Sequence, residues 1–520
     1  MANTNLFQSL RGRFPPPADT ANEAGGTAYA LGREHRLAQY AATGCLNGTF
    51  YASAEAQLDA VLALCEDVDP AFIAKTAVYC RERGYMKDVP ALLVAALTLR
   101  GPQYLPAVFG RVIDSGKMLR NVVQILRSGA VGRKSLGTRP KKLVQQWLNT
   151  ASERALLSAA IGTRPSLADV VKMVHPKPAE AWRAAFFARL IGKPYDPAAL
   201  PPATQAFEAY RQARAEGGQA PVPELPFQML ASLDLDAQAW AEVARQGGWQ
   251  MVRMNLNTFA RHGVFALPGM AQEIAAKLRD PVAIARARVF PYQLLAAYQA
   301  AGGELPAVVR EALQDALELA LANVPQVEGR MVVCPDVSGS MHSPVTGYRG
   351  SASSAVRCVD AAALVAATFL RKQPDTVVLP FKEEVVTLTL NPRDTVMTNA
   401  QKMAEIGAGG TNCSAPLAWL NHRRVSADLV MLVSDNQSWM DVRHGPTATL
   451  REWERFRQRN PKARLVCLDM QPYAGSQAPE RDDILNIGGF SDSVFQIVAA
   501  FAAGQLHAGH WVGEISALNL

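Results

Sequence analysis

Apolar residues recur with a helical spacing over roughly the first 325 residues, in short segments separated by Gly, Pro and Asp. The segments whose pattern predicts helices are residues 54–64, 70–83, 89–100, 104–116, 118–128, 140–150 and 306–322. Residues 200–226 are rich in Pro, Ala and Gly and predict a long connection or a frayed helix. Because helix pairs of this kind cannot bury their apolar faces alone, the pattern favours an irregular α-solenoid of the HEAT type. A compact multi-helix bundle fits the pattern equally well.

A different pattern begins after Val324 and Pro325, where short apolar runs alternate with helical segments. The runs that predict strands are residues 331–334, 376–381, 385–390, 428–434 and 463–470, and the helical segments are 356–371, 415–421 and 447–459. This alternation predicts a doubly wound α/β sheet. We therefore expect a helical domain over residues 1–328 and an α/β domain over residues 329–520.

Length and charge fit this division. A chain of 520 residues is too long for one ordinary domain. Residues 1–329 hold 35 Lys and Arg against 28 Asp and Glu, whereas residues 330–520 hold 18 of each, so the net charge of +7 belongs to the helical part. An anionic partner should therefore bind there.

The sequence favours a cytoplasmic location. It has no apolar run of about 18 residues that could span a bilayer, and its first residues lack the apolar core of a signal peptide. The seven cysteines are scattered, without Cys-x-x-Cys pairs, and are expected to be reduced thiols.

The run MVVCPDVSGSM, residues 331–341, predicts a buried strand that ends in three oxygen ligands, Asp336, Ser338 and Ser340. Ligands bind at the carboxyl ends of such strands, and carboxylate and hydroxyl oxygens suit Mg²⁺. Alone, the Asp-x-Ser-x-Ser pattern could equally be a serine turn that caps a helix. Thr411 follows two glycines in a later loop, and Asp435 ends a second apolar run. Together these residues resemble the metal-ion-dependent adhesion site of von Willebrand factor A domains, whose motif matches Asp336, Ser338, Ser340, Thr411 and Asp435.

A Gly-rich stretch, residues 127–142, is strongly basic. Its cations are Arg127, Arg133, Lys134, Arg139, Lys141 and Lys142. Mobile cations and exposed backbone N–H groups in one loop can follow the phosphates of RNA. The alternative is a solvated charged loop without a ligand.

Two further segments hold candidate RNA contacts. In VVKMVHPKP, Lys172, His175 and Lys177 surround prolines that stop a helix. In QMVRMNLNTFARHG, a mostly apolar helix carries Arg253, Asn255 and Arg261, which are costly to bury unless they face a cavity or a partner. A lone histidine is more often structural, and a buried capping network between repeats is an equally good explanation for the second group.

The order of several motifs resembles the TROVE-domain family, typified by the Ro ribonucleoprotein autoantigen and its bacterial relatives. The motifs are NEAGGTAYAL and NGTFY near the start, SLADVVKMVHPKP, GWQMVRMNLNTFARHGVF, VFPYQLLAAY, DVSGSM, SDNQSW and the late NIGGF. The resemblance implies an all-α ring of HEAT-like repeats whose ends are bridged by a von Willebrand factor A domain. It also implies that small noncoding Y RNAs bind the basic outer surface and that 3′ ends of misfolded RNAs enter the central hole.

The same resemblance bears on single residues and partners. His175 matches the family's Y-RNA-contacting histidine, but the lysine-bearing segment that vertebrate members place upstream is reduced here to IGTRPS, with only Arg164. By analogy with bacterial members, a Y-like RNA would tether the protein to a 3′ exoribonuclease, polynucleotide phosphorylase. We expect the protein itself to be a monomer within such a ribonucleoprotein, with no membrane partner.

The sequence shows no catalytic constellation. It has no serine nucleophile elbow, no GxxxxGK[ST] phosphate loop and no zinc-type His/Cys spacing. We therefore expect a non-enzymatic RNA-binding protein that acts in noncoding-RNA quality control or degradation. The alternative is a protein-binding adapter whose A-domain metal captures an acidic side chain, without RNA.

Overall fold

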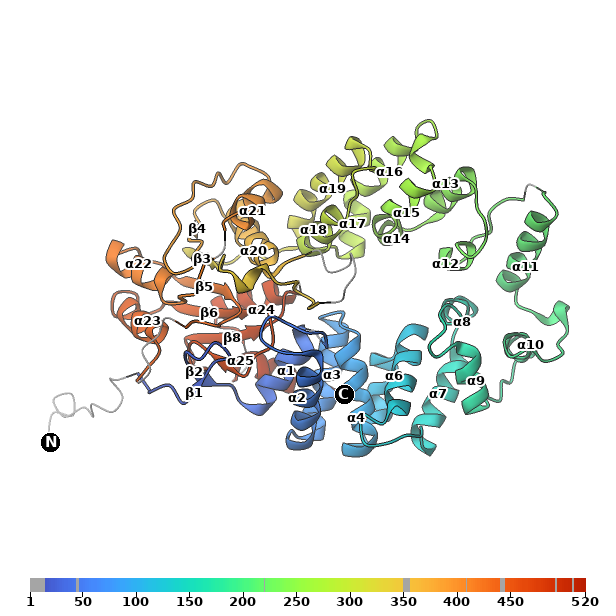
Figure 1. Cartoon of the computed structure of the whole chain (residues 1–520), viewed down its shortest axis with the longest axis horizontal. Helices are drawn as coiled ribbons and strands as arrows, with labels where there is room; N and C mark the ends of the chain where they lie inside the picture. The colour runs from blue at the N-terminus through green and yellow to red at the C-terminus, as the bar shows by residue number, and fades with distance from the viewer. Residues whose placement is uncertain are drawn as a thin grey trace. The chain divides into compact units, whose positions relative to one another are not determined.

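The computed structural model describes residues 15–43, 46–218, 220–348, 356–407, 409–439, 445–491, 493–506 and 509–520. The chain divides into two compact units. Within the described residues, the first unit combines the chain up to Leu64 with Phe290–Ala296 and Ala320–Ala517, and the second combines Cys65–Val289, Ala297–Leu319 and Leu518–Leu520. Figure 1 shows that the second unit is built of helices and that the first contains the parallel sheet.

The helices begin and end at residues that suit helix termini. Asp69 caps one by accepting from the Ala71 N–H, with Pro70 as its first residue, and a left-handed Gly129 ends another. From the N-terminal side of the second unit the helices are α2 (Ala54–Asp67), α3 (Pro70–Glu82), α4 (Asp88–Arg100), α5 (Leu105–Val112), α6 (Gly116–Ser128), α7 (Thr138–Thr150), α8 (Glu153–Ala159), α9 (Leu167–Val174), α10 (Ala181–Leu190) and α11 (Pro202–Ala215). They continue with α12 (Phe227–Leu230), α13 (Ala237–Gln246), α14 (Trp249–Met254), α15 (Leu256–Arg261), α16 (Met270–Leu278), α17 (Pro281–Ala287), α18 (Pro291–Gln299) and α19 (Ala307–Ala320).

Helices of the second unit pack mainly on near neighbours in the chain. Helix α3 packs on α4 and α5, α6 packs on α8 and α9, and α14 packs on α16 and α17. The closest-packed pairs join helices at most four positions apart, as expected for stacked repeats and not for a compact bundle. The helical-repeat fold class is thus confirmed for this unit. Among the described helices, none is both long and apolar enough to cross a membrane.

Two segments of the helical part differ from the sequence prediction. Residues 202–215 form the regular helix α11, because Pro202 starts it and Thr204, Phe207 and Tyr210 bury one face at helical spacing. The expected single helix at QMVRMNLNTFARHG is two short helices, α14 and α15. They meet at Asn255, whose Nδ2 donates to the Met251 carbonyl oxygen at 2.7 Å and whose φ of −119° leaves the helical range.

The first unit contains a five-stranded parallel sheet in the order β4-β3-β5-β6-β8. Its strands are β3 (Met331–Pro335), β4 (Val377–Val378), β5 (Leu429–Ser434), β6 (Arg464–Asp469) and β8 (Ile484–Gly488), and its helices are α20 (Cys358–Lys372), α21 (Val396–Ala404), α22 (Ala415–Arg423), α23 (Ala448–Arg459), α24 (Ser493–Ala502) and α25 (His510–Ser516). Every residue of β3 and β5 is buried, as in parallel sheets covered on both faces.

Helices cover both faces of this sheet. Side chains of α22 and α23, such as Leu417 and Trp453, share one core with Val332 and Leu432. Helix α20 contacts β3, β4 and β5, and its Phe369 ring lies 5.3 Å from the Phe495 ring of α24. The predicted doubly wound α/β sheet is therefore confirmed.

One predicted strand, residues 385–390, is absent as a strand from the described structure. The Lys382 N–H donates to the Glu384 carbonyl oxygen, and Val386 N–H donates back to Pro380. This tight turn gives Val385 a single antiparallel bridge with Phe381 and directs the following residues away from β4.

The N-terminal residues pack with the α/β sheet, whereas the sequence pattern assigned them to the helical domain ending at residue 328. A small antiparallel sheet joins β1 (Thr20–Ala21), β2 (Thr27–Ala30) and β7 (Gly475–Ser476). Helix α1 (Arg33–Thr43) packs on β8 and α25. These pairings join residues over 400 positions apart, so local patterns do not reveal them.

The six cysteines in the described ranges are buried and free, as predicted. Cys45 lies outside the described residues.

Candidate functional site

The five predicted metal ligands lie together at the carboxyl edge of the sheet. Asp336, Ser338 and Ser340 follow β3, Asp435 follows β5, and Thr411 precedes α22. Because β3 and β5 are adjacent parallel strands, their carboxyl ends meet at one edge. All five side chains are buried.

Hydrogen bonds fix the geometry of these loops. The Ser338 N–H donates to Asp336 Oδ1 at 2.8 Å, and Thr411 Oγ1 donates to Ser338 Oγ at 2.8 Å. Ser338 Oγ lies 3.5 Å from Ser340 Oγ. Ser434, the last residue of β5, donates its hydroxyl to Asp336 Oδ2 at 2.5 Å and was missed by the sequence motif. The hydroxyls and one carboxylate thus converge on one point.

The electrostatics of the site suit a cation. Burial and mutual repulsion raise the pKa of Asp336, and burial raises that of Asp435. Asp435 Oδ2 is buried and has no hydrogen-bond partner. The described residues contain no group of three or more His, Cys, Asp or Glu side chains that could hold a metal, so hydroxyls must supply part of any ligand set here. Two carboxylates and three hydroxyls are hard oxygen donors that fit Mg²⁺.

Two further residues border the site beside Thr411. The Trp439 side chain is about half exposed and lies against Gly410, where an added Cβ would collide with the indole ring. Glu383 accepts a hydrogen bond from the Gly410 N–H. The SDNQSW motif contains Trp439, but no sequence signal marked Glu383 as more than a solvated acid.

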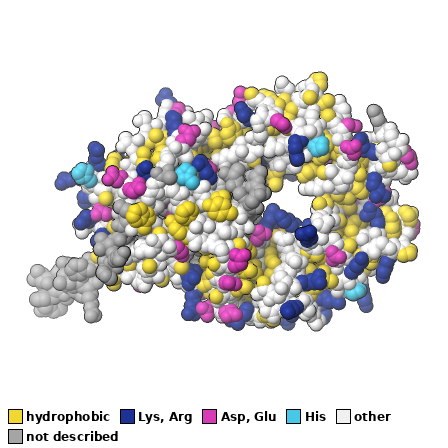
Figure 2. Space-filling view, viewed as in Figure 1, with side chains coloured by type: hydrophobic (Ala, Val, Ile, Leu, Met, Phe, Trp, Pro, Cys, Tyr) yellow, Lys and Arg dark blue, Asp and Glu magenta, His cyan; other side chains and the backbone are white. Residues whose placement is uncertain are grey.

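Four of the six predicted loop cations line one open cleft in the helical unit. They are Arg127, Lys134, Lys141 and Lys142, with Gln145 and Met173 also lining the cleft. None of the lining residues is acidic. On the face that Figure 2 shows, Lys and Arg side chains recur over the helices from α6 to α11.

The other two loop arginines are placed differently. Arg133 Nη1 lies 3.4 Å from the Thr98 carbonyl oxygen as a donor, and its guanidinium fills the space next to Gly137. Arg139 is exposed at the start of α7 and does not line the cleft. Arg133 is therefore a loop-packing residue in this structure.

His175 ends α9 in a left-handed conformation, with φ of 52°, and its side chain is exposed. Lys172 and His175 line a second cleft against α10, and Lys177 is exposed two residues further on. Gln145 of α7 donates from Nε2 to the carbonyl oxygens of Val174 at 2.5 Å and His175 at 3.3 Å. Because Gln145 also lines the basic cleft, the two predicted contact regions are neighbours on one surface.

The third predicted group is not brought together. Arg253 donates to Gln250 Oε1 and lies over the Trp249 ring, and burial lowers its pKa to about 10. Arg261 is exposed and donates to Thr258 Oγ1. Of the three, only Asn255 lines a cavity. Arg253 thus serves packing in α14, which was the alternative explanation.

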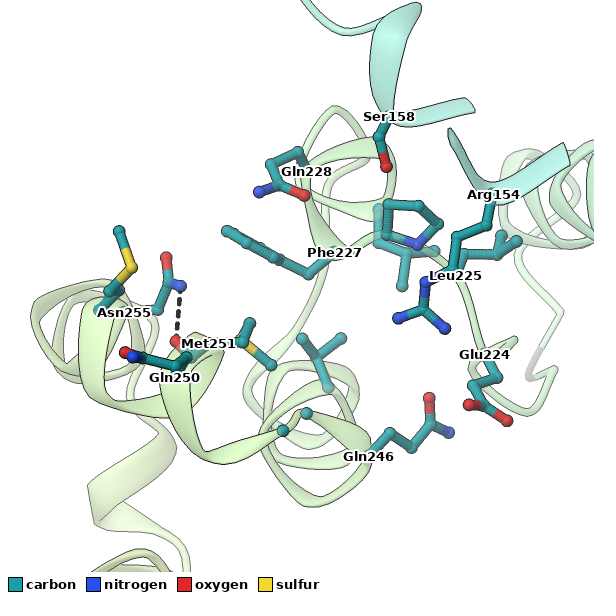
Figure 3. Close-up of a pocket in the computed structure, with 16 residues that line it drawn as sticks. Arg154, Ser158, Glu224, Leu225, Phe227, Gln228, Gln246, Gln250, Met251 and Asn255 are labelled. Carbon is teal, nitrogen blue, oxygen red and sulfur yellow. Dashed lines mark hydrogen bonds between the residues drawn. The ribbon is translucent and has the colours of Figure 1, made fainter. Parts of the chain in front are cut away.

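The cavity beside Asn255 occupies about 370 Å³ between α8, α12, α13 and α14. Figure 3 shows Arg154, Phe227 and Met251 directed toward this space from different helices. Gln228, Gln246 and Gln250 add amide groups to the lining. Apart from Asn255, these residues were not predicted, because they come from helices with no distinguishing motif.

Comparisons with known proteins extend over both units. Residues 330–502 match the model of the Ro60 vWA domain. The chain is 28% identical to the RNA-binding protein RO60 of Deinococcus radiodurans over 528 residues, which covers 93% of this chain and 95% of the relative. It is 27% identical to the RNA-binding protein RO60 of Caenorhabditis elegans over 244 residues, or 45% of this chain and 37% of the relative.

Solved structures agree on the fold. The crystal structure of the Deinococcus radiodurans RO (RSR) protein matches with a TM-score of 0.64 at 24% identity, covering 91% of this chain and all of that one. The resemblance indicated by the sequence motifs is thus confirmed: the chain is a relative of the Ro60 proteins and carries a Ro60-type von Willebrand factor A domain at residues 330–502.

Proposed function

We propose that this protein binds noncoding RNA, with a structured Y-like RNA held on the surface formed by the basic cleft and the His175 turn. The observation that carries the proposal is the cleft itself, where Arg127, Lys134, Lys141 and Lys142 converge without an acidic neighbour. Such a surface attracts a phosphate backbone and releases its counterions. The printed names of the two curated relatives, both RNA-binding proteins, support the same class of ligand.

We extend the proposal to single-stranded 3′ ends of misfolded RNA, and hence to RNA quality control or degradation. The cavity of Figure 3 supports this part. Phe227 offers a flat apolar face, Arg154 a guanidinium, and Asn255 and Gln228 amides that can pair with base edges. Proteins recognise unstacked RNA bases with side chains of these kinds. A central hole that takes up such ends, as the resemblance implies, belongs to the same proposal.

For the A domain we propose that Asp336, Ser338, Ser340, Thr411 and Asp435 bind Mg²⁺. The cation would supply a Lewis-acidic position for a carboxylate from a protein partner. The buried, unpartnered Asp435 Oδ2 is the observation that favours this second function. An exoribonuclease partner and a cytoplasmic location stay predictions from the sequence.

Replacing Lys134, Lys141 and Lys142 together by Ala tests the RNA surface. Each phosphate contact contributes roughly 0.9 to the slope of log affinity against log salt, so the slope should fall by about 2 to 3 if all three lysines contact phosphates. Filter binding with a structured RNA at several salt concentrations measures both slope and affinity. Lys462→Ala, which removes an exposed lysine of the A domain, is the control.

An unchanged slope in the triple variant would show that the cleft is only a solvated surface. The same assay with RNAs that differ only in a single-stranded 3′ tail tests the second part. Tailed RNA should compete better than the blunt form, and equal competition would contradict recognition of ends.

A further inference from the structure

The metal site has a border that its sequence motif does not include. This border is the N-terminal segment, defined here as the described residues from 19 to 52. Asn22 Nδ2 donates to the Ser438 carbonyl oxygen at 2.7 Å, and the Ala24 N–H donates to Gln437 Oε1 at 3.2 Å. The segment therefore contacts the loop that carries Asp435.

The same segment also contacts the loop that carries Ser340. Asn47 Nδ2 donates to the Thr346 carbonyl oxygen at 2.9 Å, and the Tyr348 N–H donates to the Gly48 carbonyl oxygen at 2.8 Å. The Tyr51 ring packs edge-on against Tyr473, with centroids 5.6 Å apart. Two of the three ligand-bearing loops are thus attached to residues from the start of the chain.

One position shows how closely the segment fits. Gly26 is buried, and a Cβ there would collide with the Ser438 carbonyl oxygen. Its N–H donates to Asn22 Oδ1 at 2.7 Å, so the turn also holds the Asn22 side chain in place. Gly32, in the same segment, has no atom within 4 Å of an added Cβ and provides a matched comparison.

Attachment of the segment brings another negative charge to the site. Gln437 Nε2 donates to Glu23 Oε2 at 2.9 Å, and the Ala474 N–H donates to Glu23 Oε1 at 3.1 Å. The Gln437 N–H donates in turn to Asp435 Oδ1 at 3.2 Å. One residue therefore bridges Glu23 and a predicted metal ligand. Without a cation, Glu23 repels Asp336 and Asp435, whereas a divalent cation between them turns this repulsion into attraction.

We infer that a divalent cation at Asp336 and Asp435 fastens the N-terminal segment to the A domain, with Glu23 acting through Gln437 as an added acidic group of the metal centre. The inference rests on the metal site proposed above. Binding of the cation and attachment of the segment then favour each other to the same extent, because coupling free energies are reciprocal.

Hydrogen exchange of the full chain, in Mg²⁺ and in excess chelator, measures attachment. Calorimetric titration with Mg²⁺ measures affinity. In the wild-type protein Mg²⁺ should slow exchange of the amides in residues 20–30 and 46–52. Gly26→Ala should weaken Mg²⁺ binding by about fivefold or more and remove most of that protection. Gly32→Ala should change neither.

Glu23→Gln covers the case in which Gly26→Ala fails to fold. It preserves the shape of the side chain and removes its charge. Without metal its segment should exchange more slowly than in the wild type, and the added protection by Mg²⁺ should shrink. The inference is overturned, and the metal site retained, if Mg²⁺ binds the wild type but leaves exchange of the segment unchanged. Failure of the wild type to bind Mg²⁺ overturns both.

Discussion

Cations that look equivalent in the sequence have different roles in the structure. Lys134 and Lys141 line an open cleft, whereas Arg133, in the same loop, turns toward the Thr98 carbonyl oxygen. Arg253 likewise pairs with Gln250 and covers Trp249. Sequence shows that a cation is present, but its direction depends on acceptors that other helices supply. The metal motif has no such ambiguity, since strand ends fix where its ligands lie.

His175 combines an exposed imidazole with a left-handed backbone, and two substitutions separate these properties. Asn tolerates φ near 52° better than Ala, so His175→Asn removes the ring with little strain. We expect both His175→Asn and His175→Ala to weaken binding of structured RNA severalfold, and only the Ala variant to lower the melting temperature. Filter binding and thermal unfolding measure the two effects.

Wild-type affinity in both variants would show that His175 serves only to end α9.

At the scale of elements, most helix limits follow from the sequence. Helix α3 occupies Pro70–Glu82, where the pattern predicted 70–83, and α4 ends at Arg100 as predicted, because caps, prolines and glycines act locally. The parallel strands were equally visible as apolar runs. What could not be predicted is pairing at a distance, such as β2 with β7, or the break at Asn255, which depends on a side chain bonding back to its own helix.

Close packing of α6 on α8 depends on one glycine. A Cβ at Gly116 would collide with Ala159 of α8, whereas a Cβ at Gly110 of α5 would meet no atom within 4 Å. We expect Gly116→Ala to destabilise the helical unit by about 1–3 kcal/mol through overpacking. Gly110→Ala should stabilise it by about 0.5–1 kcal/mol, because Ala loses less backbone entropy in a helix. Urea denaturation followed by circular dichroism measures both.

A loss of stability in both variants, or in neither, would contradict this account of the α6–α8 contact.

Helix α1 should make the first unit sensitive to acid. Its His35 is buried against Trp511, with ring centroids 5.4 Å apart, and burial lowers its pKa to about 4. Because the folded protein disfavours the charged form, stability is full above the unfolded pKa near 6.5 and is lost as pH falls toward 4. The loss between pH 7 and pH 5 should be about 2 kcal/mol.

His35→Phe retains an aromatic ring against Trp511 but cannot be protonated. Thermal unfolding at the two pH values should show a smaller loss in this variant than in the wild type. Equal losses would mean that other groups cause the acid sensitivity.

At the scale of the whole molecule, the proposal divides RNA binding and metal binding between the two units. We expect Mg²⁺ to raise the melting temperature modestly, because a ligand bound only by the folded state stabilises it, and Asp336→Ala to abolish this rise. RNA binding should survive the substitution, since the cations that line the cleft belong to the helical unit. Thermal unfolding and filter binding on the same preparations measure the two outcomes.

A folded Asp336→Ala protein that no longer binds RNA would show that the division of roles is wrong.

The attachment of the N-terminal segment also sets an order of events during synthesis. Gln39 of α1 donates to Asp469, 430 positions later in the chain, whereas the helical repeats pack on near neighbours. At about 5–20 residues per second, the ribosome needs on the order of 20 to 90 seconds to make that stretch. The repeats can fold meanwhile, since local contacts form quickly. The apolar face of α1 must wait for its partners, which makes the start of the chain the natural client of a chaperone.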